Sequence, residues 1–281
     1  MTSYLNSNLS QVYHYFAFSY NKPITEFDTA SFITSIDVDV GNPEIERNRE
    51  GIERRVHSFL APHVVGRIEE QVVPLLLQAF DEVELPVTFA LRGQLTEVEN
   101  SIIGLMLESS NRHDIAAHGY THKVFTALSE VEAEQELSMI SVGMKKFGIV
   151  PKSFVFPKNE VSHLPLLEKY GYLSFRGRGG FLRDGMYVKK CGNMFDIHPS
   201  LYLRGFYDFR FLRKIINFAA RQKRPLHLWF HPWNLGSSSD AASKRIAKVL
   251  VPLIEYAKEK KRRGLLQFET MRSIAEKCEN K

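Results

Sequence analysis

The chain has very little cysteine and no long hydrophobic run. Cys191 and Cys278 are the only cysteines in 281 residues, which excludes a disulfide framework and a cysteine-rich zinc module. No apolar stretch approaches the roughly 18 residues that a transmembrane helix needs. Residues 1–21 carry no charged side chain, so they lack the positive start of a signal peptide. We therefore expect a cytoplasmic protein whose two thiols are unpaired.

Glycine-rich phosphate-binding motifs are also missing, because neither G-x-G-x-x-G nor G-x-x-x-x-G-K-[ST] follows a predicted strand. The formal charge is +5 and the pI is about 9.1, which is a weak indication of an anionic partner. The basic run at residues 258–263 could bind nucleic acid or a membrane surface. It is more typical of the last turn of a helix, where cations suit the helix dipole, so we expect no nucleic-acid partner.

Short β-rich runs alternate with amphipathic segments along the whole chain. The predicted strands are residues 31–37, 86–91, 114–117, 153–156, 172–175, 226–230 and 265–268, and the predicted helices are residues 67–83, 97–109, 130–147, 209–222 and 241–263. This alternation indicates an α/β fold with a mostly parallel sheet. With no Gly/Pro-rich linker, it favours one domain over residues 1–281, with residues 1–30 as an N-terminal arm or cap. An irregular (β/α) barrel of about seven parallel strands is predicted, and a doubly wound open sheet is the alternative.

Local signals mark several element boundaries. Ser129 and Glu132 have the spacing of a capping box, and Asp208 is placed to cap the helix that follows it. Gly148 and Gly264 stand where helices are expected to end. The charged segment at residues 41–66 is predicted to be a loop at the carboxyl end of the first strand, where the active sites of barrels form.

Three polar segments follow predicted strands. Asp37 and Asp39 close the first strand, although aspartate is also common in turns and helix caps. His118 and His122 have the i, i+4 spacing that lets two imidazoles share one metal ion, and Asp39 is the natural third ligand. His231 comes directly after an apolar strand, where it is well placed to donate a proton beside a hydrolytic metal site.

In this order, the segments resemble the NodB-type polysaccharide deacetylases, which are metal-dependent carbohydrate esterases of family 4 on an irregular (β/α) barrel. The Asp pair matches their first motif, His118 and His122 match the H-x-x-x-H of the second, and Leu228 through His231 match the late motif. Residues 268–271 resemble the family's last strand-to-helix junction. The resemblance spans roughly residues 32–275.

The resemblance implies a role for each matching residue. Asp39, His118 and His122 would hold Zn²⁺ or another divalent transition metal, Asp37 would be the general base, and His231 would be the general acid that protonates the departing amine. The residues predicted to contact the substrate are Leu228, Trp229, Pro157, Lys158 and Tyr120. The substrate would be an N-acetylated sugar or glycan, and a cytoplasmic glycan precursor suits a chain without a secretion signal.

Two motifs depart from the family pattern. Many relatives carry R-x-P-x-G at the third motif, but Val155 stands at the Arg position and Asn159 at the Gly position. Lys158 could supply the missing cation. The family's Asp-Trp motif is also missing, and the stretch that replaces it contains Arg176 and Arg178, which could contact an anionic substrate group or lie in a solvated loop. The residue that orients His231 is therefore not identified from the sequence.

Three alternatives to the deacetylase remain open. The closest is a hydrolase acting on another C–N amide or on an O-acetyl ester. A catalytically inactive carbohydrate-binding relative gains some weight from the altered third motif. A basic nucleic-acid binder depends only on the pI and the run at residues 258–263, and it predicts binding that weakens steeply with salt. The oligomeric state does not follow from the sequence.

Overall fold

The computed structural model describes residues 24, 27–39, 62–97, 102–178, 185–203, 209–236 and 238–280. Three sequence-based predictions lie wholly or largely outside these residues. They are the N-terminal arm, most of the loop predicted at residues 41–66, and the helix cap Asp208.

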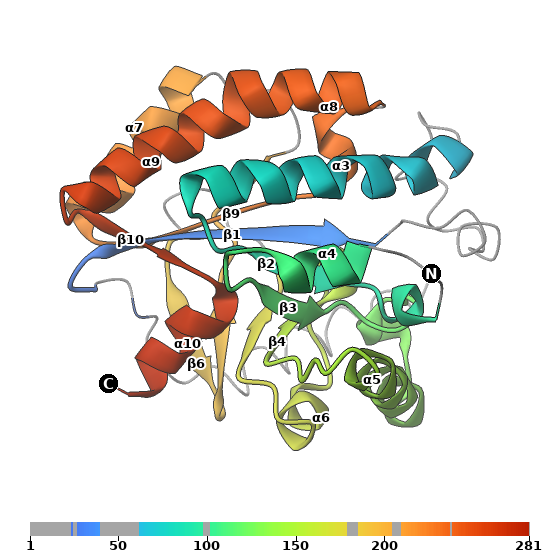
Figure 1. Cartoon of the computed structure of the whole chain (residues 1–281). Coiled ribbons are helices and arrows are strands. Elements are labelled where there is room, and N and C mark those ends of the chain that lie inside the picture. The colour runs from blue at the N-terminus through green and yellow to red at the C-terminus, as the bar shows by residue number, and fades with distance from the viewer. Residues whose placement is uncertain are drawn as a thin grey trace, which may run out of the picture.

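The described residues contain one ten-stranded sheet, curled into a half-barrel (Figure 1). Its strands are β1 (Ala30–Val38), β2 (Thr88–Leu91), β3 (Asp114–Ala117), β4 (Ser153–Val155), β5 (Ser174–Arg176), β6 (Val188–Cys191), β7 (Met194–Ile197), β8 (Leu201–Tyr202), β9 (Pro225–Phe230) and β10 (Leu266–Glu269). Their order is β6-β7-β5-β4-β3-β2-β1-β9-β8, and β10 pairs with the first half of β1. The pairings are parallel apart from β6–β7. The predicted irregular (β/α) barrel is confirmed.

Each of the seven predicted strands is present, and three further strands were not predicted. In β6 the sequence VKKC places two lysines in a four-residue strand, and β8 has two residues, so neither shows a hydrophobic pattern. The strand β7 is turned back against β6 by a tight connection through Gly192, whose φ of +62° suits glycine.

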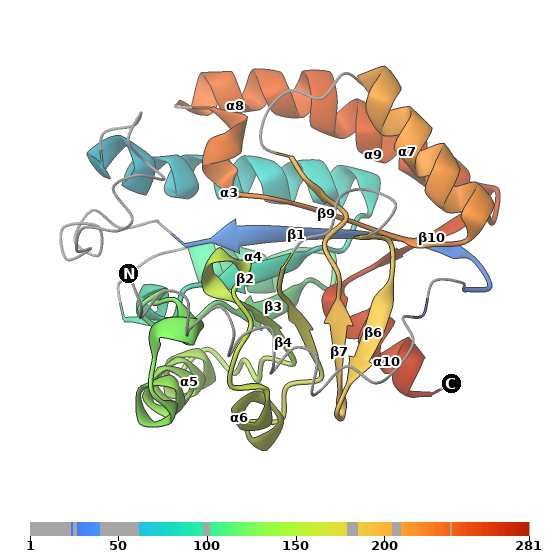
Figure 2. The ribbon, with the colours of Figure 1, turned by 180° about the vertical axis from the view of Figure 1, so that it is seen from behind.

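Helices cover the outer face of the sheet on both sides of β1. In Figure 1 the helices α3 (Pro62–Val83), α7 (Phe209–Gln222), α8 (Ser239–Arg245) and α9 (Val251–Arg262) lie together above β1 and β9. Figure 2 shows α4 (Ile102–Glu108), α5 (Glu130–Lys145) and α6 (Leu164–Lys169) on the other side. The predicted capping box begins α5, since the Ser129 side chain accepts from the Glu132 N–H and the Glu132 carboxylate accepts from the Ser129 N–H.

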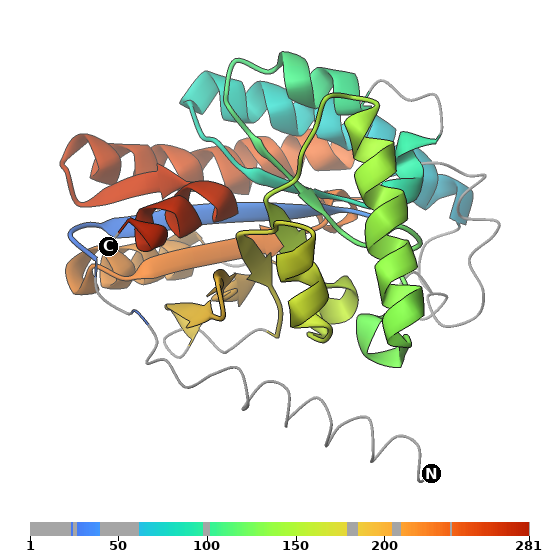
Figure 3. The ribbon, with the colours of Figure 1, turned by 90° about the horizontal axis from the view of Figure 1, so that it is seen from below.

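The helix predicted at residues 241–263 is present, but it is not α-helical throughout. A π-helical turn, η7 (Ile246–Leu250), separates α8 from α9. Pro252 stands at the start of α9, and a proline ring clashes with the carbonyl group one turn earlier. A wider turn before Pro252 relieves this clash. The helix α10 (Met271–Glu279) follows the strand-to-helix junction inferred at residues 268–271 and closes the amino end of the half-barrel, where its Met271 N–H donates to Thr88 Oγ1 at 2.9 Å (Figure 3).

Side-chain alternation along the strands separates two apolar layers. Phe32 and Ile36 of β1 belong to the larger cluster, together with the helices, whereas Ile33 belongs to the smaller interior cluster with Ala90 and Val155. By the same alternation, the odd-numbered side chains of β1 point into the half-barrel, and Asp37 is the last of them. No helix in the described ranges combines the length and apolar character needed to span a bilayer.

Candidate active site

The polar segments predicted from the sequence meet at the carboxyl end of the half-barrel. Asp37 lies near the end of β1 and Asp39 directly after it, His118 follows β3, and His231 follows β9. β1 pairs with both β2 and β9, and β3 pairs with β2, so the three strand ends are neighbours. The register therefore brings together residues that are almost 200 positions apart in the chain.

Asp39, His118 and His122 form a compact set of possible metal ligands. One ligand atom from each of them lies within 4.8 Å of the others, and the three side chains are buried. His122 Nε2 is 3.5 Å from Asp39 Oδ2, and the two imidazole rings meet edge to face at 4.7 Å. Two imidazoles and one carboxylate are the donor set of a hydrolytic zinc site with an open position. The residues therefore fit a divalent transition metal.

The protonation of His118 also suits a ligand. Its Nδ1 lies 2.7 Å from the carbonyl oxygen of Val155, and because a carbonyl can only accept, Nδ1 carries the proton. The lone pair of Nε2 then faces the site, as is usual for metal-bound histidines. Burial lowers the pKa of His118 to about 4, so the imidazole is neutral at pH 7.

A buried carboxylate holds the turn that carries both histidines. Glu136 of α5 accepts hydrogen bonds from the Tyr120 N–H at 2.7 Å, the Thr121 N–H at 2.8 Å and the Thr121 hydroxyl at 2.6 Å. The turn needs this support because His122 has a φ of +64°, which is strained for a residue with a side chain. Gly119, at φ +67°, begins the turn. Nothing in the sequence pattern marks Glu136 apart from the other acidic residues of its helix.

We expect Glu136→Ala to weaken metal binding by roughly 10- to 100-fold, as loss of outer-shell support typically does. Glu136→Gln should retain most of the affinity, because its amide oxygen can still accept from the two N–H groups. The measurement is a competition titration of the apoprotein with Zn²⁺. The matched control is Glu134→Ala on the same helix, which removes an exposed glutamate paired with Lys169. An equal loss in both variants would contradict a specific role for Glu136.

Arg176 supplies the cation that the third motif lacks. It ends β5, is fully buried, and donates to both carboxylate oxygens of Asp37, from Nη1 to Oδ1 at 2.8 Å and from Nη2 to Oδ2 at 2.5 Å. In the parallel pairing of β4 and β5, Arg176 is the direct partner of Val155, which stands at the family's Arg position. The guanidinium thus comes from the adjacent strand. The prediction that Arg176 lies in a solvated loop is wrong, because its side chain is buried at the end of β5, and the exposed Lys158 is not the cation that pairs with Asp37.

The surroundings of Asp37 keep it ionised. Burial alone would raise the pKa of this carboxyl group, but the charge of Arg176, reinforced by His118, His231 and the Arg176 hydrogen bonds, outweighs burial and lowers the pKa below its usual range. Asp37 Oδ2 lies 3.9 Å from His118 Nε2 and 3.8 Å from His231 Nε2. Asp37 is therefore a carboxylate at neutral pH that faces the metal-ligand set and His231 together.

His231 is positioned by aromatic neighbours and one hydroxyl. Its Nε2 lies 4.0 Å from Asp39 Oδ2, while Tyr202 Oη of β8 lies 3.3 Å from its Nδ1. Its ring stacks on the Trp233 ring, with 4.4 Å between the ring centres. The backbone N–H of His231 donates to Asn234 Oδ1 at 2.7 Å. Tyr202 is therefore the residue whose hydroxyl group is placed to orient the His231 ring. Tyr202 could not be identified from the sequence, because the two-residue β8 does not stand out as a strand.

The predicted substrate-contacting residues separate into two groups. Trp229 lies at the site, half-buried, with the Arg176 guanidinium 4.4 Å from its ring and Tyr202 stacked on it at 4.0 Å. Leu228, the neighbouring residue of β9, points to the opposite face and packs in the helix-covered core, so the structure does not bring it to the site.

Three further predicted contacts lie around the histidine turn. Tyr120 is buried in the core between α5 and the turn η2 (Gly93–Thr96), which its ring approaches closely at Gly93. Pro157 is buried beside Gly119 at the start of η4 (Pro157–Asn159), and Lys158 is exposed in that turn. Pro157 therefore packs behind the turn that carries the histidines, while the Tyr120 side chain packs in the core.

Comparisons with known proteins match part of the sequence to a family and the fold to solved structures. Residues 61–173 match the family described as polysaccharide deacetylase. A structure from Mycobacterium smegmatis, described as a polysaccharide deacetylase, is 19% identical with a TM-score of 0.69, covering 91% of this chain and 94% of that one. Another so described, from Pseudomonas aeruginosa, is 14% identical with a TM-score of 0.63, covering 88% and 90%.

An allantoinase structure is also similar, at 14% identity and a TM-score of 0.63, with 88% of this chain and 89% of that one covered. No curated protein matches the chain by sequence. At these identities the structures show the fold alone, and the family match rests on residues 61–173. The resemblance seen in the sequence is thereby confirmed: the chain carries the polysaccharide deacetylase family segment on the fold of solved structures described as such deacetylases.

Proposed function

We propose that this protein is a metal-dependent hydrolase that removes the acetyl group from an N-acetylated sugar, as a single catalytic domain. Asp39, His118 and His122 would hold the divalent ion, which we expect to be Zn²⁺. The single observation that carries the proposal is that Asp37 Oδ2 lies within 4 Å of both a ligand imidazole, His118, and the proton donor His231. A general base and a general acid thus face the same reacting centre.

The bound ion would polarise the acetyl carbonyl group and lower the pKa of a water molecule. Asp37 accepts a proton from the attacking water molecule while the water oxygen forms a bond to the carbonyl carbon. His231 Nε2 donates a proton to the amide nitrogen as the C–N bond breaks, because an amine leaves poorly unless it is protonated. The products are acetate and a free amino sugar. Arg176 keeps Asp37 ionised until it accepts this proton and holds the carboxyl group in place, and the half-buried ring of Trp229 forms the wall beside the acetyl methyl group.

The test is an acetate-release screen of the purified protein across nucleotide sugars, chitooligosaccharides and peptidoglycan fragments, with Zn²⁺ added back. Release from at least one N-acetyl sugar is expected. The same groups would serve another C–N amide or an O-acetyl ester, so O-acetylated sugars belong in the panel, and hydrolysis of allantoin, which releases no acetate, is followed separately by loss of the substrate. Saturable sugar binding without any acetate release would instead support the non-catalytic carbohydrate-binding relative.

We expect His122→Ala to abolish stoichiometric metal binding, because only two ligands remain. Metal analysis should give about one divalent ion per chain for the wild type and far less for the variant. His163→Ala is the matched control, because this histidine also has a positive φ, of 53°, but bonds to the Leu128 carbonyl away from the site. Full metal content in His122→Ala would exclude the proposed ligand set.

We expect Tyr202→Phe to lower kcat for acetate release by up to about tenfold, which is a fraction of what general acid catalysis contributes. The variant keeps the ring that stacks on Trp229 and loses only the hydroxyl at His231 Nδ1. KM and metal content should stay unchanged, since the ring and the ligands remain. The check is steady-state kinetics, and an effect confined to KM would show that Tyr202 contacts the substrate rather than positioning His231.

A further inference from the structure

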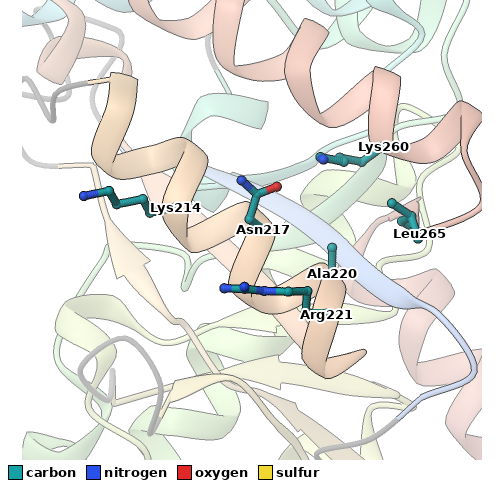
Figure 4. A pocket seen from close by; sticks show the side chains of 6 residues that line it. All are labelled: Lys214, Asn217, Ala220, Arg221, Lys260 and Leu265. Atoms are coloured by element: carbon teal, nitrogen blue, oxygen red, sulfur yellow. The ribbon is translucent and has the colours of Figure 1, made fainter.

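A cavity of about 320 Å³ lies between α7 and α9, far from the proposed catalytic groups. It is lined by Lys214, Asn217, Ala220, Arg221, Lys260 and Leu265 (Figure 4). α7 and α9 pack side by side (Figure 2). The volume falls in the range of small-molecule sites, which is about 300–1,000 Å³. The cavity therefore has room for a compact ligand.

The cavity lies at the amino ends of the strands, opposite to the catalytic edge. Arg221 is in the last turn of α7, four residues before β9 begins, and Leu265 directly precedes β10. His231 follows the far end of β9, so the length of that strand, about 20 Å, separates the two regions. A ligand here cannot be the sugar that reacts at Asp37.

Most of the accessible wall of the cavity is apolar, and the polar groups that its lining residues carry are hydrogen-bond donors without any carboxylate. The groups are two ammonium ions, a guanidinium and the amide of Asn217. The carbonyl oxygen of Asn217 already accepts from the Tyr256 hydroxyl at 2.7 Å, which leaves its N–H₂ group for a ligand. Within the described part of the chain, no acidic side chain forms an ion pair with Lys214, Arg221 or Lys260. The polar groups that remain for a ligand are all donors, so they favour a ligand that presents acceptors, such as an anion.

The basicity of the whole protein is concentrated on these two helices. α7 carries four cationic residues and no acidic one, and α9 carries four cationic and two acidic residues. Their net charge of +6 exceeds the +5 of the entire chain. The helix dipole favours cations in the last turn of a helix, and this accounts for the presence of Arg221 and Lys260 without a ligand. Lys214 is in the middle of α7, where the dipole gives no such reason.

One of the cations is held in place by an aromatic ring. Tyr256 of α9 has the Arg213 guanidinium 4.6 Å from its ring centre and the Lys260 ammonium 5.0 Å from it, while its hydroxyl fixes Asn217. These contacts restrain Lys260 and Asn217 before any ligand arrives, which lowers the entropy lost on binding. The apolar side chains of Ala220 and Leu265 complete the wall.

We propose that this α7–α9 cavity binds a phosphate group, carried by a small phosphorylated molecule or by a phospholipid headgroup. Lys214 and Lys260 act as point charges, Arg221 can bind two phosphate oxygens at once, and the Asn217 amide donates a further hydrogen bond. The proposal is independent of the deacetylase activity, because no residue of the cavity touches the catalytic groups.

The experiment measures phosphate binding by the metal-loaded full chain through calorimetry and the midpoint of thermal unfolding, at constant ionic strength held with chloride. The wild type should bind inorganic phosphate saturably and be stabilised by it. The variant Lys214→Gln/Arg221→Gln should bind at least about tenfold more weakly, because two charge-assisted contacts are lost. The matched control is Arg262→Gln/Arg263→Gln, which removes two exposed cations at the end of α9 outside the cavity lining and should stay within about twofold of the wild type.

A second arm uses phosphatidylcholine vesicles with and without phosphatidic acid. Sedimentation with the acidic vesicles that is lost in the cavity variant and kept in the control identifies a lipid headgroup as the source, and phosphate binding with inert vesicles identifies a small phosphorylated molecule. No binding in either arm, or equal weakening in both variants, overturns the proposal. Acetate release should be the same in both variants, so a failure here is distinct from a failure of the proposed function.

Discussion

Replacing Asp37 by asparagine is expected to lower the rate of acetate release by a factor of about 10²–10⁴ while the divalent ion stays bound. The substitution keeps the size of the side chain and a carbonyl oxygen that can accept from Arg176 Nη1. It removes the basic oxygen Oδ2, which faces His118 and His231 within 4 Å. Because Asp37 is not in the ligand set of Asp39, His118 and His122, metal content should not change.

The measurement is kcat for acetate release beside metal analysis of the same preparation. Asp114→Asn is the matched control, because Asp114 is also a buried carboxylate inside the half-barrel, held by the hydroxyl groups of Ser153 at 2.6 Å and Thr88 at 3.2 Å. Burial raises the pKa of Asp114, which favours the neutral carboxylic acid, so the neutral amide of asparagine is a close replacement. Activity lost equally in both variants would point to damaged folding, and activity retained in Asp37→Asn would exclude Asp37 as the base.

The grouping of the candidate metal ligands could be predicted from the sequence because it depends on local patterns. His118 and His122 are four residues apart in one turn after a strand, and Asp37 and Asp39 close another strand. Adding the rule that parallel strands end at one edge of a sheet was enough to place them together. His231 followed in the same way from the apolar run of β9.

The supporting groups could not be predicted, because they depend on pairing between segments. Arg176 reaches Asp37 only because β5 pairs with β4 in the register that sets Arg176 beside Val155, and no local pattern encodes a register. Tyr202 belongs to a strand of two residues, and Glu136 is one of four glutamates in α5. Each acts across the fold on a residue that the sequence had already identified.

Leu228 is a residue that the motif assigned to the site but that the structure places in the core. It was chosen by motif position, but the two-residue period of a strand places it on the face opposite Trp229 and His227. His227 is buried, points inward and lies 2.8 Å from Ser35 Oγ, and this hydroxyl oxygen accepts from Arg176 at 2.8 Å. Burial lowers the pKa of His227 to about 3, so it is a neutral partner in this network. Strand parity was thus the stronger guide.

Replacing Arg176 by methionine is expected to destabilise the protein by about 3–5 kcal/mol, because it leaves the buried carboxylate of Asp37 without its charged partner. The same variant should lose most of its acetate-release activity. Arg176→Lys keeps the charge but cannot form the two-point contact, so an intermediate loss is expected. Denaturant unfolding of the three proteins, with metal removed by a chelator, measures the stability term.

The pH dependence of Arg176→Met distinguishes a lost ion pair from a simple packing defect. In the wild type the lowered pKa of Asp37 means that its ion pair contributes stability above the ordinary carboxyl pKa of about 4, which is lost as the pH falls through the folded pKa. Without the guanidinium, burial remains as the largest influence and raises the pKa of Asp37 instead. The variant should therefore gain stability, relative to the wild type, as the pH is lowered from about 7 to about 5. A packing defect alone would give a constant difference over this range.

The double variant Asp37→Asn/Arg176→Met completes the cycle. If the cost of Arg176→Met comes from an unpaired buried charge, removing that charge as well should restore a large part of the lost stability, and the two single effects will not add. Stability that falls further, by the sum of the single losses, would show that the two residues act independently and that Arg176 is not the partner that keeps Asp37 ionised. Activity should stay absent in the double variant, because a neutral amide at position 37 cannot accept the proton of the attacking water whatever the stability of the fold.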